Sequence, residues 1–315
     1  MEQRSSNDNT LEIKHISKAT EEIVSYIDNR RKGIVTSLRT RWTKFNHATM
    51  GGIEPNIIMT IAGISGSGKS SFVNSLETDL IDYNRNEDII ILSFNFEMLS
   101  SKQVGRKLSY KLMKTTGELY SSGYDGSPVS DDLFEQIQKE AEHIKHYPVY
   151  YVDSPCTVDQ MQDMVKRFQH SEKTKDKWLV VILDHTLLTK GKSGENEREI
   201  LANLQKAFME LKKTGRTTII QLSQMNRDIE SSERILNPQM HFPMRRDLFG
   251  SDSLFQASDY VIVLHRPELL GIAEYSPNRW PVKNKIYMHF LKVREGEPKI
   301  LSFINNLKYN RIDEV

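Results

Sequence analysis

The chain has 315 residues, which is enough for one large domain, or a domain with an appendage, around a full hydrophobic core. Its 43 Lys and Arg residues against 42 Asp and Glu give a net charge of +1, which excludes a global basic field of the kind that marks many nucleic-acid-binding proteins. A single cysteine, Cys156, excludes an internal disulfide and a thiolate metal site and favours a reducing cytoplasm, and no apolar run approaches the length of a membrane span.

The N-terminal region combines a polar start with an isolated helical pattern. Residues 1–10 lack the apolar core of a signal peptide, so we expect a disordered lead-in. A helical pattern follows from Leu11 to about Arg31. Its apolar stripe consists of Ile13, Ile16, Ala19, Ile23 and Ile27. Nothing next to it in the sequence would cover this stripe, so the helix either folds back on its own domain or lies in a groove of a neighbouring subunit.

A glycine-rich segment joins an apolar strand to a helix, after an irregular connection over 32–56. The strand covers 57–62, and Gly63-Ile64-Ser65-Gly66-Ser67-Gly68-Lys69-Ser70 matches the P-loop pattern G-x-x-x-x-G-K-[ST]. Such a loop points successive N–H groups at the phosphates of a nucleoside triphosphate. Lys69 is expected to reach the β and γ phosphates, and the Ser70 hydroxyl to bind Mg²⁺. The predicted nucleotide contacts are Gly63, Ser65, Gly66, Ser67, Gly68, Lys69, Ser70 and Ser71.

Strands and helices alternate after the P-loop. The predicted strands cover 89–95, 149–152, 178–183, 217–222 and 260–264. Predicted helices cover 100–114, 131–146, a stretch beginning at 157, and 195–213, with a loop over 115–130. This alternation predicts an α/β fold with a doubly wound, mainly parallel sheet. Near the C-terminus, 286–290 and 300–304 flank a turn at Gly296 and Pro298, which predicts an antiparallel hairpin at the sheet edge.

Polar residues follow three of the predicted strands. In a doubly wound sheet the functional site lies beyond the carboxyl ends of the strands. Glu97 could take a proton from a water that attacks the γ-phosphate, or orient that water; the other reading is an exposed carboxylate at a helix start. Asp184 occupies the Walker B position and would hold Mg²⁺ through its water shell. The Gln224 amide could sense the γ-phosphate.

Five motifs, in this order, resemble those of the DnaB-type replicative helicases. They are Gly63–Ser70, Phe96-Glu97-Met98, Ile182-Leu183-Asp184, Leu222-Ser223-Gln224 with Arg227, and Leu291-Lys292-Val293-Arg294-Glu295-Gly296. The stretch from Thr40-Arg41-Trp42-Thr43-Lys44-Phe45-Asn46 to Gly52-Ile53-Glu54-Pro55 also resembles the family's entry to its RecA-like domain. The resemblance covers about residues 34–305 and is specific as a set, because order and rough spacing agree.

The resemblance implies a RecA-like P-loop NTPase fold over 33–315 and a homo-oligomeric ring, a hexamer, with ATP and Mg²⁺ bound between subunits. It implies 5′ to 3′ translocation on single-stranded DNA during replication, with Glu97 as catalytic base and Gln224 as γ-phosphate sensor. Lys292 and Arg294 would reach into the next subunit's site, Arg294 as the arginine finger; the alternative for both is a solvated hairpin edge. The helix over 11–32 would be the linker that docks on the neighbour.

The first departure from the family concerns its N-terminal collar, which binds loaders and primase. Only about thirty residues precede the RecA-like region, so the collar has no room and we expect a ring without its second tier. This suggests a viral motor in the host cytoplasm. A primase or a loader stays a candidate partner by resemblance.

The second departure concerns the DNA-facing loop. The family follows this loop with an acid, an apolar residue, an arginine and an acid, whereas this chain has Asp247-Leu248-Phe249-Gly250. The predicted DNA contacts are Arg227, Arg245 and Arg246. The loop over 226–244 holds about as many acids as bases, so we expect it to line the pore with a few arginines and backbone amides on phosphates. The alternative is a disordered surface excursion.

Two other functions compete with a DNA motor. The first is a RecA-like recombinase or signalling ATPase that uses ATP binding to control assembly. Lys292 and Arg294 favour the motor, whereas the altered region around Phe249 leaves this alternative open. The second is a non-enzymatic assembly or loading factor. A purely structural nucleotide site would require neither a base nor a sensor, so the joint presence of Glu97 and Gln224 argues against it.

Overall fold

The computed structural model describes residues 13–34, 37–123, 127–186, 189–191 and 194–315, which form two compact units divided after Thr36. The first unit contains one described helix, α1 (Ile16–Arg31), whose N-cap His15 accepts a hydrogen bond from the Ser17 amide. The helix begins later than the predicted Leu11, and the predicted lead-in over 1–10 lies outside the described residues. None of the α1 residues is buried, and Ile16, Ile23 and Ile27 are more than half exposed.

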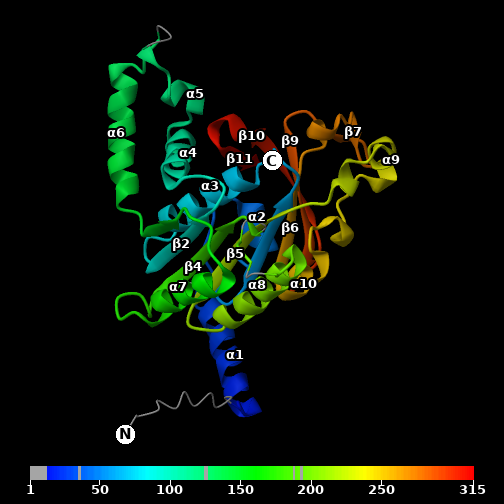
Figure 1. The fold of residues 1–315 in the computed structure, drawn as a ribbon. Helices are drawn as coiled ribbons and strands as arrows, with labels where there is room; N and C mark the ends of the chain where they lie inside the picture. The colour runs from blue at the N-terminus through cyan, green and yellow to red at the C-terminus, as the bar shows by residue number, and fades with distance from the viewer. Residues whose placement is uncertain (1–12, 35–36, 124–126, 187–188, 192–193) are drawn as a thin grey trace. The chain divides into compact units, whose positions relative to one another are not determined.

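The second unit is built on one large sheet with strand order β11-β10-β9-β6-β1-β5-β4-β2-β3 (Figure 1). The parallel strands are β1 (Ile58–Gly63), β2 (Ile89–Asn95), β3 (Val149–Val152), β4 (Trp178–Asp184), β5 (Thr217–Gln224) and β6 (Tyr260–His265). The antiparallel strands are β9 (Lys285–Val293), β10 (Ile300–Asn306) and β11 (Arg311–Glu314). The predicted doubly wound α/β fold is confirmed. The hairpin is not the sheet edge, however, because β11 pairs outside it.

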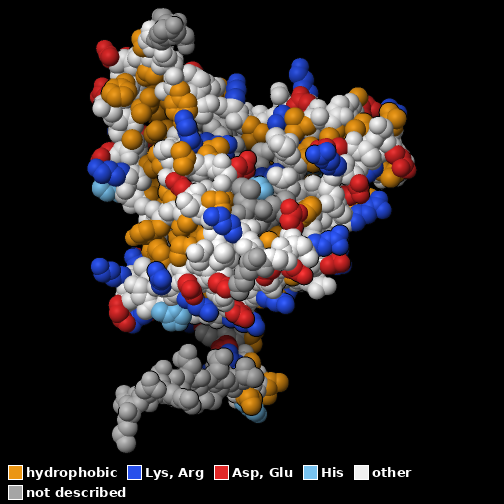
Figure 2. All heavy atoms as spheres, viewed as in Figure 1, with side chains coloured by type: hydrophobic (Ala, Val, Ile, Leu, Met, Phe, Trp, Pro, Cys, Tyr) orange, Lys and Arg blue, Asp and Glu red, His pale blue; other side chains and the backbone are white. Residues whose placement is uncertain are grey.

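Helices cover both faces of the sheet (Figure 1). The described helices of this unit are α2 (Thr43–Ala48), α3 (Lys69–Asp82), α4 (Ser100–Leu112), α5 (Thr116–Leu119), α6 (Asp131–Lys145), α7 (Val158–His170), α8 (Glu197–Leu211), α9 (Ser232–Leu236) and α10 (Ser251–Ala257). The predicted connection over 32–56 and the predicted loop over 115–130 thus contain short helices, α2 and α5. Figure 2 shows apolar side chains gathered over the arm formed by α4, α5 and α6. No described helix is long and apolar enough to cross a membrane.

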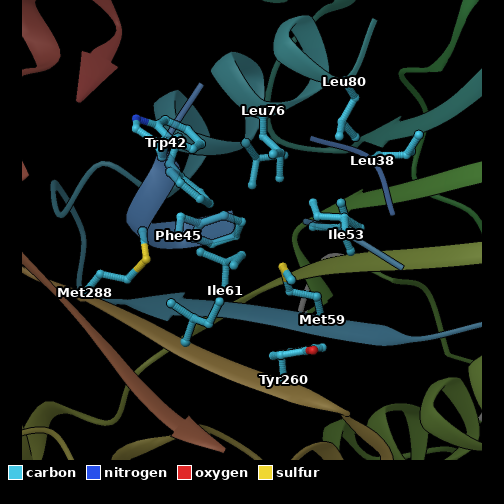
Figure 3. Packing of buried hydrophobic residues seen from close by; sticks show 14 of the residues in the cluster. Leu38, Trp42, Phe45, Ile53, Met59, Ile61, Leu76, Leu80, Tyr260 and Met288 are labelled. Carbon is cyan, nitrogen blue, oxygen red and sulfur yellow. The ribbon is translucent and has the colours of Figure 1, made fainter. Parts of the chain in front are cut away.

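The core follows from the period-2 alternation of the strands. Met59 and Ile61 of β1 face α2 and α3, where they join the cluster around Trp42 that Figure 3 shows from close by. The Trp42 indole stacks on the Phe72 ring, with centroids 4.7 Å apart. Ile58, one position earlier, belongs to the cluster on the other face, against α7 and α8. Both faces are therefore apolar, as expected for a parallel sheet covered by helices.

Strand β11 and helix α2 lie far apart in the sequence but are hydrogen-bonded to each other. A Glu314 carboxylate oxygen accepts from the Phe45 amide at 2.7 Å, and the other accepts from the Lys44 amide at 2.9 Å. The Trp42 indole N–H donates to the Ile312 carbonyl at 3.0 Å. Glu314 thus satisfies two of the free N–H groups at the start of α2. The last described strand of this unit thus holds its first helix in place.

The segment that follows β5 is folded. It contains the short 3-10 helices η3 (Arg227–Glu230), η4 (Pro238–Met240) and η5 (Arg245–Asp247) together with α9. Its buried Arg234 guanidinium donates to the Met240 and Phe242 carbonyls and to Asp247 at 2.5 Å. The alternative of a disordered excursion is therefore wrong. A small ribbon of β7 (Glu274–Tyr275) and β8 (Trp280–Pro281) follows the 3-10 helix η6 (Pro267–Leu270), and η7 (Leu307–Tyr309) precedes β11.

Candidate functional site

The P-loop turns tightly between β1 and α3. A side chain at Gly63 would place its Cβ 2.4 Å from Ser67 Oγ and 2.7 Å from the Leu264 carbonyl oxygen. Gly68, the N-cap of α3, has a φ of 99°, which favours glycine, and its Cα faces Leu307 at a distance that leaves no room for a Cβ. The buried Ser67 Oγ has no hydrogen-bond partner among the described residues. The loop is thus shaped as a backbone cradle of the kind that binds phosphate.

Lys69 lies within this cradle. Its Nζ donates to the Gly63 carbonyl at 2.8 Å and to the Ile64 carbonyl at 3.0 Å. Burial lowers the pKa of Lys69, while the Asp184 and Glu97 carboxylates act in the opposite direction. The ammonium group thus contacts the loop and is close enough to both predicted carboxylates for their charges to act on it.

Asp184 is buried at the end of β4 and accepts a hydrogen bond from the Ser70 hydroxyl. Burial raises the pKa of Asp184; the Ser70 bond opposes this shift, and the Glu97 charge adds to it. A hydroxyl and a carboxylate are the oxygen ligands that Mg²⁺ accepts when it keeps its waters and binds phosphate. No group of three His, Cys, Asp or Glu side chains suited to a metal is found in the described ranges. The Ser70 and Asp184 pair fits a magnesium ion that also binds water and phosphate.

Glu97 lies beside Asp184 because their strands are neighbours. In the β2 and β4 register Asn95 faces Asp184, and the Phe96 amide donates to the Asp184 carbonyl at 3.0 Å. The Glu97 side chain is exposed, and its charge influences the pKa of both Asp184 and Lys69. The structure thus brings the predicted base close to Asp184 and Lys69.

Gln224 ends β5, opposite Gly63 of β1. Its side-chain nitrogen lies 3.5 Å from Nε2 of His185, and the His185 Nδ1 is buried with no hydrogen-bond partner within the described chain. Burial lowers the pKa of His185, against the effect of the neighbouring carboxylates. His185 is not among the residues predicted from the sequence, although its place directly after the Walker B acid was a usable signal.

Arg106 of α4 is a second residue that the sequence did not reveal. Its guanidinium is close enough to Asp184 and Glu97 for the charges to interact, and burial lowers its pKa. Its Nη1 is buried and, as far as the described residues go, has no hydrogen-bond partner. Only the packing of α4 beside the strand ends brings it here, so its position could not be predicted from spacing along the chain.

A pocket of about 560 Å³ opens on the other side of the P-loop. Its lining residues are Arg266, Asn284, Asn305, Asn306, Leu307 and Lys308. Arg266 Nη1 donates to the Gly66 carbonyl at 2.9 Å, and Leu307 packs against Gly68, so the pocket adjoins the loop directly. The strands that carry Glu97, Asp184 and Gln224 all lie on the opposite side of β1.

Lys292 and Arg294 lie on the side of the sheet where the parallel strands begin, opposite to the P-loop of the same chain. We call this side the amino edge and the other side, where the parallel strands end, the carboxyl edge. In the antiparallel pair of β6 and β9, Val293 faces Tyr260 at the amino end of β6, whereas the P-loop follows the carboxyl end of β1. Arg294 Nε lies 3.0 Å from Asp259, and Lys292 Nζ donates to the Phe255 carbonyl at 2.7 Å. The structure does not bring these cations to the other site residues.

The predicted DNA contacts lie around the segment after β5. Arg245 forms an ion pair with Asp252 at 2.6 Å and covers the Phe255 ring. Arg227 and Arg246 are exposed. The segment returns to β5 at its base, where the Phe249 amide donates to the Gln224 carbonyl at 3.2 Å.

Comparisons with known proteins agree with this arrangement. The replicative DNA helicase DnaB of Helicobacter pylori is 24% identical over 268 residues, which cover 82% of this chain and 51% of that protein. Its counterpart in Mycobacterium leprae is 30% identical over 218 residues, covering 69% of this chain and 33% of that protein. The chain thus spans about half the length, or less, of these curated relatives.

Two solved structures share the fold. An ATPase domain superposes with a TM-score of 0.80 at 17% identity, covering 96% of this chain and all of that domain, 100%. A DnaB-like replicative helicase, described with its interactions with primase, superposes with a TM-score of 0.78 at 18% identity, covering 96% of this chain and 68% of that one. The family model for the DnaB-like helicase C terminal domain matches residues 7–314. With nearly the whole sequence matched, the chain belongs to the DnaB-like helicase C-terminal domain family.

Proposed function

We propose that this chain is the ATP-hydrolysing motor of a ring-shaped helicase that moves 5′ to 3′ on single-stranded DNA during replication. One observation carries the proposal. The phosphate cradle, the carboxylates and Gln224 gather at the carboxyl edge of the sheet, whereas Arg294 lies at the amino edge, beyond the reach of its own P-loop. A site of this kind is completed when copies of the chain contact head to tail, and such contacts close into a ring.

Hydrolysis follows from the positions of the side chains. The P-loop amides and Lys69 would hold the β and γ phosphates, and Ser70 and Asp184 would hold Mg²⁺, which would supply neutralising charge to the phosphates. Glu97 orients the attacking water and accepts its proton. Gln224 contacts the γ-phosphate and changes its contact once that phosphate has left. Arg294 of the neighbouring copy offsets the charge that develops in the transition state.

The nucleoside lies in the pocket lined by Arg266 and the asparagines. The γ-phosphate must face the carboxylates on one side of β1, so the ribose and base extend to the other side, where this pocket adjoins Gly66 and Gly68. The amide groups of Asn305 and Asn306 offer both donors and acceptors to a base edge.

The ring, which we take to be a hexamer, uses α1 as its linker. The apolar stripe of α1 is exposed and suits a groove on a neighbouring copy. The apolar surface over α4, α5 and α6 is a candidate receptor, with a cavity of about 270 Å³ between α4 and α6. A primase or a loader is a further candidate partner, since one relative of this fold is described with primase. We propose that the ring acts in the cytoplasm, which is that of the host if the protein is viral. Burial raises the pKa of the Cys156 thiol to about 11, so this cysteine stays protonated and unreactive, as suits a reducing compartment.

The test is ATP hydrolysis and unwinding of a forked duplex by wild type and Glu97→Gln, with Glu172→Gln as the matched exposed control. We expect Glu97→Gln to bind ATP and to hydrolyse it at least about 100-fold more slowly, because a general base is lost. Wild-type hydrolysis should rise with single-stranded DNA. Unchanged turnover in Glu97→Gln would remove Glu97 from this role, and hydrolysis that ignores DNA would favour the signalling or assembly ATPase.

A further inference from the structure

Asp259 is a buried carboxylate directly before β6, at the amino edge of the sheet. Its Oδ2 accepts from the Ile58 amide at 2.8 Å and from Lys212 Nζ at 2.6 Å. Its Oδ1 lies 3.0 Å from Arg294 Nε. One carboxylate oxygen is thus fixed by two donors from the interior of the domain, and the other forms the ion pair with Arg294.

The backbone around Asp259 holds the same partners. The Asp259 amide donates to the Ile58 carbonyl at 2.8 Å, and the Arg294 amide donates to the Asp259 carbonyl at 3.0 Å. Val293, the residue before Arg294, is buried and faces Tyr260 in the register of β6 and β9. Asp259 therefore fixes both the backbone from which the Arg294 side chain starts and the charged group in which it ends.

The Arg294 side chain is open to a ligand although its anchor is buried. It is 55% exposed, whereas the Asp259 side chain is 6% exposed. An arginine has five N–H donors, of which one is on Nε and four are on the two Nη atoms. An ion pair on the Nε side therefore leaves the Nη fork available to a phosphate. A shared ATP site needs this group from the neighbouring copy.

Other cations lie close to Arg294. Burial lowers the pKa of Lys292; the Arg294 and Lys212 charges add to this shift, and the Asp259 charge opposes it. The four charged groups are therefore near enough to interact. Two ammonium groups repel a guanidinium beside them, and the Asp259 carboxylate offsets that repulsion.

We propose that Asp259 is a positioning residue for the arginine finger: it holds the Arg294 guanidinium in the orientation that meets the γ-phosphate bound to a neighbouring copy. The inference rests on the proposed function and adds the residue that prepares the finger. Ile58 begins β1, which ends at Gly63 of the P-loop, so one carboxylate joins the finger to the strand that carries its own P-loop. A guanidinium that is fixed before the neighbour arrives loses little conformational entropy on contact.

The experiment measures ATP hydrolysis by the full chain for wild type, Asp259→Asn, Arg294→Ala and the double variant. Rates are divided by the number of sites that bind a fluorescent, non-hydrolysable ATP analogue, so unfolded chains do not contribute. In Asp259→Asn, kcat should fall by about a hundredfold while KM for ATP stays within about twofold, because a misplaced group weakens the transition state alone. In the Arg294→Ala background, Asp259→Asn should change kcat by less than about twofold, because no finger remains to be positioned.

Lys212→Met is the matched control. It removes the other charged partner of the Asp259 carboxylate and leaves the ion pair with Arg294 in place. It should lower the stability of the chain, because a buried pair is broken, but keep most of the wild-type kcat. Mixing Asp259→Asn with Lys69→Ala should restore part of the activity, since some interfaces then combine an intact P-loop with a correctly positioned Arg294.

The outcomes separate this inference from the proposed function. If Arg294→Ala keeps the wild-type kcat, no finger acts between copies, and the shared site of the proposed function fails together with this inference. If Arg294→Ala is impaired but Asp259→Asn loses no more activity than Lys212→Met, or loses the same factor with and without Arg294, Asp259 stabilises the fold alone and the motor stands. Failure of Lys69→Ala to restore Asp259→Asn, while it restores Arg294→Ala, has the same meaning.

Discussion

The two edges of the central sheet differ in how their polar groups are satisfied. At the carboxyl edge the buried Ser67 Oγ, Arg106 Nη1 and His185 Nδ1 have no hydrogen-bond partner in the described part of the chain. At the amino edge Asp259 accepts from the Ile58 amide, Lys212 and Arg294. Unsatisfied buried groups are rare in native proteins and often mark function. One half of the proposed site is therefore built to receive a ligand, and the other half is already satisfied within its own chain.

The largest effect should come from removing the cation of the amino edge. In Arg294→Ala, ATP hydrolysis should fall by about a thousandfold, because an arginine supplied in trans stabilises the transition-state charge. Mixing Arg294→Ala with Lys69→Ala should restore part of the activity, since some interfaces then combine an intact P-loop with an intact Arg294.

The control for this measurement is Arg167→Ala, at an exposed position on α7. Steady-state hydrolysis of each variant alone and of mixtures decides the matter. If Arg294→Ala alone is inactive and mixing restores no ATP hydrolysis, Arg294 does not reach the P-loop of a neighbouring copy. The difference between the two edges would then have no role in hydrolysis.

A smaller effect should follow from Asp259→Asn, which breaks the satisfied cluster at the amino edge. Lys212 and Asp259 are both buried, and their charged atoms lie 2.6 Å apart. Leaving one buried charge without its partner should lower the free energy of unfolding by about 3 kcal/mol. Urea unfolding of wild type and variant measures this, with Asp88→Asn, an exposed acid, as control. If Asp259→Asn loses no more free energy of unfolding than Asp88→Asn, the cluster around Asp259 does not stabilise the amino edge.

The smallest effect concerns His265, a buried group at the carboxyl edge that belongs to neither half of the site. Both of its ring nitrogens lack a partner among the described residues, and burial lowers its pKa to about 3. The unfolded chain takes up a proton below the ordinary pKa of 6.5, whereas the folded chain does not. The contribution to stability is thus present above about pH 6.5 and lost as the pH falls toward 3, with about 2 kcal/mol gone at pH 5.

His265→Phe should remove much of this pH dependence, while His146→Gln, at the exposed C-cap of α6, should not. Unfolding by urea at about pH 8 and pH 5 gives the difference for each protein. The His265 imidazole would then be an unsatisfied buried group that affects stability alone, whereas the unsatisfied Ser67 and Arg106 lie where a phosphate is expected. The same pH slope in His265→Phe and wild type would show that other groups set the acid sensitivity.

The sequence predicted that three polar residues lie together at the carboxyl ends of the strands, because neighbouring parallel strands end at the same side of a sheet. Glu97, Asp184 and Gln224 could be placed from the ends of three apolar runs. Arg106 and Arg266 could not, since each reaches the site through the packing of its element against its neighbours. The short elements α2 and β11 were missed for a similar reason: Glu314 satisfies the start of α2, and neither has a strong local signal.

The hydrogen bonds between α2 and β11 affect how the chain folds during its synthesis. The hydrogen bonds of Glu314 join residues 269 and 270 positions apart in the chain. While a ribosome is still making the protein, Trp42 and Phe45 must wait without their final covering until residue 314 has emerged. Contacts of such long sequence separation form slowly. The growing chain therefore carries an incompletely covered aromatic cluster while the 269 positions from Phe45 to Glu314 are made, and chaperones have that long to bind it.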